Sequence, residues 1–244
     1  SQPLWTSDDI AAATGGAASS PFEATGVSID SRSVEPGDLF VALSGARDGH
    51  DFIPNALGRG AAGSLVSKEA EGPSVTVEDV FTALESLGIA ARVRATQARR
   101  GAVTGSVGKT SVTRAIEAGL RLAGRAHASV KSYNNHIGVP LTLARMPADT
   151  QRAVFEIGMN HAGEIGPLSQ MVRPQAVAIT TVGPVHIENF PDGEVGVAMA
   201  KAEIFEGLEP GGIAVLNADD RWFPQLKAAA LDAGAVVRSF GAAP

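Results

Sequence analysis

The stretch AVTGSVGKTS, residues 102–111, decides the fold of the second half of the chain. Its first three residues are apolar or β-branched, as in a buried strand, and a helical pattern follows to about Leu122. Gly105 and Gly108 let backbone N–H groups close around phosphate oxygens at the positive end of that helix. Lys109 is then placed to reach the β- and γ-phosphates, and the Thr110 hydroxyl to bind Mg²⁺. The stretch therefore predicts a phosphate-binding loop for a nucleoside triphosphate.

This loop departs from the strict P-loop pattern. The pattern G-x-x-x-x-G-K-S/T requires glycine at position 103, where this chain has Val103, so the match is to the shortened form T-G-x-x-G-K-S/T. A glycine-rich strand-to-helix turn with an unrelated lysine is the alternative, but the strand and the helix flank the loop as nucleotide binding requires. The predicted nucleotide-binding residues are Thr104, Gly105, Ser106, Val107, Gly108, Lys109, Thr110 and Ser111.

Strands and helices alternate after this loop. Apolar, strand-like runs recur at 152–157, 176–181 and 212–217, and helix-like segments lie at 140–144, 163–171 and 194–205. This alternation predicts a P-loop-type, mostly parallel sheet with helices on both faces.

The sequence before the loop predicts a smaller unit. Short strand patterns occur at 27–30, 39–43, 62–67 and 75–77, and helical patterns at 52–60 and 80–92. We therefore expect an α/β protein with a small mixed α/β domain over residues 1–97 and an ATPase domain over residues 98–244.

Composition excludes several classes of function. The net charge of −6 argues against nucleic-acid binding through a broad basic surface. Cysteine is absent, which excludes disulfides, Cys-ligated zinc, iron–sulfur clusters and thiol nucleophiles. The first residues contain neither a basic region nor an apolar core, so we expect no signal peptide. No apolar run approaches the ~18 residues of a membrane span.

Three residues of the second half are candidates for metal or phosphate chemistry. Glu156 ends a predicted parallel strand, so it faces the crevice where α/β sheets bind ligands, either as a Mg²⁺ ligand or as a rim carboxylate. His186 follows the next strand and is a metal ligand or a loop histidine. Lys201 lies on a predicted helix near Glu203 and Glu206, and its spacing alone favours a surface salt bridge.

Two polar segments are further candidates. Asn134 and Asn135 begin a loop that runs into a helix, where their side chains either cap that helix or contact phosphates. Spacing does not separate these two roles. Asn160 and His161 follow Glu156 directly and are candidate substrate contacts.

Together these segments resemble the Mur ligases, the ATP-dependent amide-forming enzymes of bacterial peptidoglycan synthesis. DSRSVEPGDLFVAL at 30–43 and DGHDF at 48–52 look like the family's UDP-binding domain, and the phosphate loop looks like its central ATPase domain. NNHIGVP at 134–140 and EIGMNHAGEI at 156–165 are similar to the branch that joins D-alanyl-D-alanine to UDP-N-acetylmuramoyl-tripeptide. AKAEIF at 200–205 and NADD at 217–220 also fit the family.

The resemblance implies a role for each candidate. Glu156 and His186 match magnesium ligands, which Thr110 and Lys201 complete to hold two Mg²⁺ ions. Lys201 matches a lysine that the family carbamylates with CO₂, giving an anionic carbamate. Lys109, Glu156, His186 and Lys201 are then the catalytic set. The implied uridine and diphosphate contacts are Ser31, Arg32, Arg47, Asp48 and His50.

The resemblance also implies a monomeric enzyme of the bacterial cytoplasm that uses ATP and Mg²⁺ and forms an acyl phosphate. The family's third domain, which binds the amine substrate, lies outside these residues, so we expect a fragment that folds and binds the UDP substrate without ligating it. A Mur ligase that adds a diamino acid and a P-loop module without ligase activity are the alternatives. A folylpolyglutamate-synthetase-like enzyme is disfavoured because that family lacks the UDP-binding domain.

Overall fold

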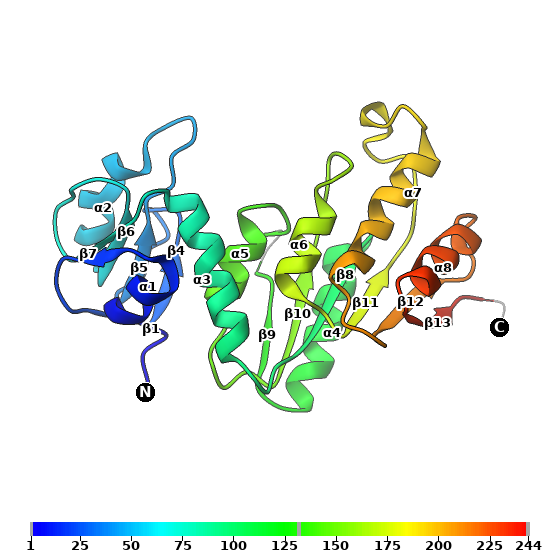
Figure 1. Cartoon of the computed structure of the whole chain (residues 1–244), viewed down its shortest axis with the longest axis horizontal. Coiled ribbons are helices and arrows are strands. Elements are labelled where there is room, and N and C mark those ends of the chain that lie inside the picture. The colour runs from blue at the N-terminus through cyan, green and yellow to red at the C-terminus, as the bar shows by residue number, and fades with distance from the viewer. Residues whose placement is uncertain (1, 131–132, 243–244) are drawn as a thin grey trace. The chain divides into compact units, whose positions relative to one another are not determined.

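The computed structural model describes residues 2–130 and 133–242. The chain divides into two compact units, one of residues 1–94 with 143–148 and one of residues 95–142 with 149–244 (Figure 1). The first unit ends at residue 94, three residues before the expected boundary at residue 97. It also contains residues 143–148, which we expected in the second unit.

The first unit is built on a five-stranded sheet in the order β2-β7-β6-β5-β4. Strands β4 to β7 run parallel, and β2 joins β7 antiparallel. Phe40, Ile53 and Val66 are buried together in its core. The elements are β1 (Trp5–Thr6), α1 (Ser7–Thr14), β2 (Ala17–Ala18), β3 (Glu23–Ala24), β4 (Gly26–Ser28), β5 (Asp38–Val41), η1 (Gly49–Phe52), α2 (Ile53–Gly58), β6 (Gly63–Val66), β7 (Ser74–Thr76) and α3 (Val80–Arg94).

Long-range hydrogen bonds to backbone carbonyls hold residues 143–148 in the first unit. The Trp5 indole N–H donates to the Ala144 carbonyl at 2.8 Å, and Trp5 is 2% exposed. The Arg94 guanidinium donates to the Met146 carbonyl at 3.3 Å and lies 3.7 Å above the Trp5 ring. These partners are 52 and 139 residues apart in the chain, so hydrophobic periodicity does not reveal them.

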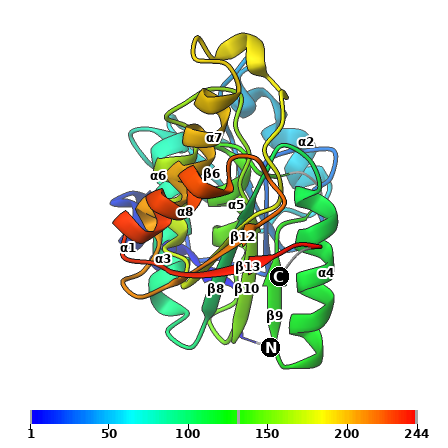
Figure 2. The ribbon, with the colours of Figure 1, turned by 90° about the vertical axis from the view of Figure 1, so that its right-hand side faces the viewer.

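The second unit is a six-stranded parallel sheet in the order β13-β12-β11-β8-β10-β9. Helix α4 lies on one face, and α6, α7 and α8 lie on the other (Figure 2). The expected α/β fold class is confirmed. The elements are β8 (Arg99–Thr104), α4 (Lys109–Leu122), β9 (Ala126–Ala128), α5 (Gly138–Ala144), β10 (Arg152–Glu156), α6 (Ile165–Val172), β11 (Ala176–Ile179), η2 (Ile187–Asn189), α7 (Glu194–Ala202), η3 (Glu203–Gly207), β12 (Ile213–Asn217), α8 (Phe223–Asp232) and β13 (Val236–Phe240).

The strand order places β8 between β10 and β11. Central strands of a parallel sheet are covered on both faces and therefore read as continuous apolar runs. Ala153, Val154 and Phe155 of β10 follow this rule, with at most 1% of each exposed. Because the three strands are parallel, their carboxyl ends meet at one edge, where open α/β sheets bind ligands.

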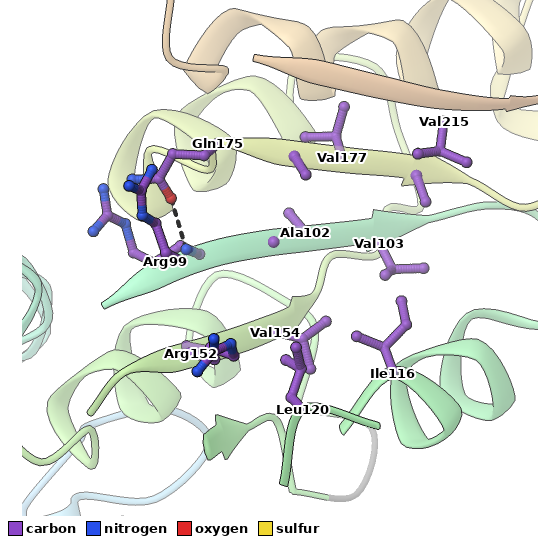
Figure 3. Close-up of a pocket in the computed structure, with 15 residues that line it drawn as sticks. Arg99, Ala102, Val103, Ile116, Leu120, Arg152, Val154, Gln175, Val177 and Val215 are labelled. Carbon is purple, nitrogen blue, oxygen red and sulfur yellow. Dashed lines mark hydrogen bonds between the residues drawn. The ribbon is translucent and has the colours of Figure 1, made fainter. Parts of the chain in front are cut away.

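A cavity of about 290 Å³ lies between α4 and the sheet (Figure 3). Apolar side chains line most of it, among them Ile116, Leu120, Val154 and Val215, whereas Arg99, Arg152 and Gln175 line its other end. It follows the middle and the amino ends of the strands, so it is separate from the phosphate loop. No helix within residues 2–130 and 133–242 is long and apolar enough to cross a membrane.

Candidate active site

The phosphate loop contains two positions with a backbone conformation that favours glycine. Gly105 and Gly108 have φ angles of 153° and 85°, in the region that L-residues rarely adopt. A Cβ atom on Gly105 would also overlap the Thr180 hydroxyl oxygen. Helix α4 begins at Lys109, and no side chain caps its first turn. Its first N–H groups and the positive end of its dipole are therefore directed at the loop, as phosphate binding requires.

The turn after β11 holds this loop from the other side. The Thr180 hydroxyl donates to the Val107 carbonyl at 2.6 Å, and the Ser106 N–H donates to the Thr181 carbonyl at 2.8 Å. The Gly183 N–H donates to the Ser106 hydroxyl at 2.9 Å, and that hydroxyl donates to the Gly183 carbonyl at 3.1 Å. Side chain and backbone together fix the loop before any ligand binds.

Glu156 lies beside the loop at the end of β10. Its carboxylate accepts hydrogen bonds from the Thr110 hydroxyl at 3.0 Å and from the Asn134 amide at 2.8 Å, and only 1% of the residue is exposed. The backbone N–H of Glu156 donates to the Ser129 hydroxyl at 2.9 Å. The sequence made Thr110 and Glu156 candidate Mg²⁺ ligands and left Asn134 as a helix cap or a phosphate contact. The structure brings all three side chains into direct contact.

Lys109 lies near this carboxylate, and Lys201 interacts with Lys109. The Lys109 ammonium donates to the Gly105 carbonyl at 2.8 Å; burial lowers its pKa, and the Glu156 carboxylate opposes that shift. Lys201 is 4% exposed, and burial lowers its pKa to about 7, with the Lys109 cation acting in the same direction. Lys201 is thus a buried amine next to a second cation and not the surface salt bridge that its spacing favours.

The residues around Glu156 offer the chemistry that a magnesium ion needs. A buried carboxylate next to a threonine hydroxyl supplies hard oxygen ligands, which Mg²⁺ prefers. Within the described ranges, no cluster of three or more His, Asp or Glu side chains is placed to hold a metal. His186 is exposed in a left-handed backbone conformation (φ 60°) ahead of η2, and no contact connects it with Glu156 in the part of the chain that is described.

The two polar segments have contacts of their own. The Asn135 side chain accepts from the N–H groups of Ile137 and Gly138, so it caps α5. Asn160 and His161 are exposed, and their backbone N–H groups donate to the Glu164 carboxylate at 2.6 and 3.2 Å. Neither has a contact with the Glu156 cluster among the described residues.

The candidate UDP contacts lie in the first unit. Ser31 is buried, whereas Arg32 and Arg47 are exposed, and Arg32 pairs with Asp30 at 2.7 Å. Sequence reasoning gave no role to Lys68, which forms a cluster with Asp48 and His50.

Asp48 organises this cluster. Its carboxylate accepts from the Lys68 ammonium and from the His50 ring, both at 2.6 Å, and from the His50 backbone N–H at 3.0 Å. The lysine contact and then these His50 contacts hold the pKa of Asp48 well below its usual range. The second His50 ring nitrogen accepts from the Ser67 N–H at 3.0 Å. Lys68 carries no sequence signal beyond following a strand, so only the fold identifies it.

Comparisons with known proteins give the family. The chain matches "Mur ligase middle domain" over residues 103–244 and "Mur ligase family, catalytic domain" over residues 23–128. It is 37% identical over 227 residues to a UDP-N-acetylmuramoyl-tripeptide–D-alanyl-D-alanine ligase of Rickettsia prowazekii, covering 91% of this chain and 50% of that protein. The chain thus spans about half the length of the curated relatives it matches.

Two solved structures are also similar. MurF from Acinetobacter baumannii gives a TM-score of 0.86 at 30% identity, over 98% of this chain and 53% of that one. MurF from Thermotoga maritima in complex with ADP gives a TM-score of 0.72 at 25% identity, over 90% of this chain and 51% of that one.

Proposed function

The chain belongs to the Mur ligase family, and we propose that it forms part of an ATP-dependent ligase that joins D-alanyl-D-alanine to UDP-N-acetylmuramoyl-tripeptide. The convergence of Lys109, Thr110, Asn134 and Glu156 on the phosphate loop carries this proposal. The curated relatives named for this reaction support the choice of substrates.

Amide formation in water needs an activated carboxylate, because a free carboxylate has no good leaving group. ATP supplies the phosphoryl group that converts the carboxylate of the tripeptide into an acyl phosphate, and Mg²⁺ supplies neutralisation of the phosphate charge. The amine of D-alanyl-D-alanine then attacks the acyl carbon, and phosphate leaves.

The side chains of this chain position the phosphates of ATP and neutralise their negative charge. The first-turn amides of α4 and the Lys109 ammonium bind the negative phosphate oxygens. The Glu156 carboxylate and the Thr110 hydroxyl would hold one Mg²⁺, and Asn134 fixes the orientation of that carboxylate. For His186 we propose a ligand role that requires its loop to move toward Glu156.

The carbamate that the resemblance implied for Lys201 is not carried over to this chain. No comparison supports that modification for the type of Mur ligase that adds D-alanyl-D-alanine, for which the curated relatives are named. Lys201 is a buried amine whose pKa is lowered by burial and by the Lys109 cation.

We further propose that the first unit binds the UDP part of the substrate. The guanidinium groups of Arg32 and Arg47 are both exposed. Asp30 already pairs with Arg32, so Arg47 is the group that we propose to take a diphosphate bidentately. The Asp48–His50–Lys68 cluster holds the adjacent loop in one conformation. Arg47→Ala should weaken UDP-substrate binding at least tenfold in titration calorimetry, about 1.4 kcal/mol.

An acceptor-dependent assay of the full-length enzyme tests the proposed reaction. With UDP-N-acetylmuramoyl-tripeptide and ATP present, ADP release should depend on D-alanyl-D-alanine and should not occur with a single amino acid. Strict use of a diamino acid with the dipeptide substrate would identify another member of the family. Nucleotide binding with no affinity for UDP-muramoyl peptides would instead indicate a P-loop module.

A further inference from the structure

Asp220 lies in the loop after β12, and its carboxylate binds the backbone of the turn after β11. One carboxylate oxygen accepts the Val182 N–H at 2.6 Å, and the other accepts the Trp222 N–H at 2.9 Å. The carboxylate therefore links the segment after β12 to the turn after β11. Hydrogen bonds from N–H groups to an ionised carboxylate are among the stronger ones in proteins.

The turn that Asp220 holds is the one that fixes the phosphate loop. Val182 is followed by Gly183, which exchanges two hydrogen bonds with the Ser106 hydroxyl. One continuous path thus runs from the Asp220 carboxylate through Val182 and Gly183 to Ser106. Nearby, the Asn217 amide donates to the Thr180 carbonyl at 3.3 Å, which fastens the same turn a second time.

The loop after β12 is also tied to the helix that carries Lys201. The Trp222 indole N–H donates to the Glu194 carboxylate at 2.9 Å, and Glu194 is the first residue of α7. The Asp220 carboxylate accepts from the Trp222 backbone N–H, so it is connected through Trp222 to the start of α7.

We propose that Asp220 is a positioning residue for the nucleotide site, which acts through the Val182–Gly183 turn on Ser106. This inference rests on the proposed nucleotide-binding role of the loop. Asp220→Asn leaves one acceptor oxygen for the two N–H groups of Val182 and Trp222, so the turn is held less firmly and moves away from the loop more often. The phosphate-binding conformation is then less populated, and ATP affinity falls by the same factor.

The neighbouring carboxylate provides a matched control. Asp219 is exposed and accepts the Ala242 N–H at 2.7 Å, so it fastens the segment after β13 and not the turn. Asp219→Asn and Asp220→Asn remove the same charge one residue apart. A general effect of charge on the protein would appear in both variants.

The test compares these variants in the full-length protein. Hydrogen exchange of the peptide that contains residues 180–184 should accelerate in Asp220→Asn and stay unchanged in Asp219→Asn. The KM for ATP should rise about tenfold in Asp220→Asn only, with the KM for the UDP substrate unchanged. Equal exchange and equal KM values in both variants would overturn the inference.

A double-mutant cycle keeps the test decisive if Asp220→Asn is poorly stable. Ser106→Ala removes the far end of the same path, so its effect on ATP affinity and that of Asp220→Asn should not add. Independent, additive effects would contradict the path through Gly183. If the wild-type protein does not bind ATP, the proposed function is refuted. The hydrogen-exchange experiment would still decide whether Asp220 holds the turn.

Discussion

Replacement of Glu156 by glutamine should remove the magnesium-dependent part of the nucleotide affinity. The affinity for nucleotide without Mg²⁺ should not change. Glutamine keeps the shape of the side chain and one acceptor oxygen for Thr110 or Asn134, but it removes the negative charge. With 1% of Glu156 exposed, the charge acts in a poorly screened environment. At an effective dielectric constant of about 20, two unit charges 4 Å apart interact by about 4 kcal/mol.

Part of this energy is offset, because neutral glutamine is cheaper to bury than a carboxylate. A net loss of about 2.7 kcal/mol corresponds to about a 100-fold weaker affinity for Mg–ADP. At a ligand concentration of 100 times the wild-type dissociation constant, bound ligand stabilises the wild type by about 2.7 kcal/mol and the variant by about 0.4 kcal/mol. For a protein of this size, the difference should lower the ligand-induced rise in Tm by about 5–9 °C.

Differential scanning fluorimetry with ADP in Mg²⁺ and in EDTA measures this effect. Glu156→Gln should show the same rise in both conditions, whereas the wild type should show a larger rise with Mg²⁺. Glu117→Gln is the control, since Glu117 lies on α4 and pairs with the exposed Arg121 at 2.6 Å. A full magnesium-dependent rise in Glu156→Gln would refute the assignment of this carboxylate.

Three further predictions concern affinity, packing and pH. Lys109→Ala should lower ADP affinity by about 10- to 100-fold with and without Mg²⁺ in titration calorimetry, since a bond to a charged group contributes about 1.5–3 kcal/mol. Trp5→Ala should destabilise the first unit by about 3–5 kcal/mol in urea unfolding, and equal stability would contradict the packing on Arg94. The pKa of Asp48 is lower in the folded state than in the unfolded state. The Asp48 carboxylate therefore adds to the free energy of unfolding above about pH 4, and this contribution is lost as the pH falls further. The difference in free energy of unfolding between the wild type and Asp48→Asn should shrink below that pH.

The sequence predicted the elements that local pattern controls. The phosphate loop, the apolar strand that ends at Glu156 and the helix from Lys109 each have a periodicity or a glycine pattern that specifies them. The carboxyl-edge rule for parallel sheets placed Glu156 in the ligand-binding crevice, and the loop motif made Thr110 a metal ligand. Strand β9, of only three residues, and strand β13, mostly exposed, have too weak a pattern to be predicted.

The remaining features depend on contacts between distant segments. Hydrogen bonds from Trp5 and Arg94, and one from Arg145 to the Val27 carbonyl, fasten residues 143–148 to the first unit. The burial of Lys201 depends on where α7 packs, so spacing along the helix favoured an exposed salt bridge instead. The link from Asp220 to Val182 spans 38 residues and joins a side chain to a backbone amide, which no sequence pattern encodes.

A crystal structure of the chain with Mg–ADP would show whether the loop of residues 104–111 binds the nucleotide phosphates. We expect the β-phosphate within this loop, with the metal bound by the Thr110 hydroxyl and the Glu156 carboxylate. A nucleotide bound elsewhere, or a metal that leaves Glu156 paired only with Thr110 and Asn134, would contradict it.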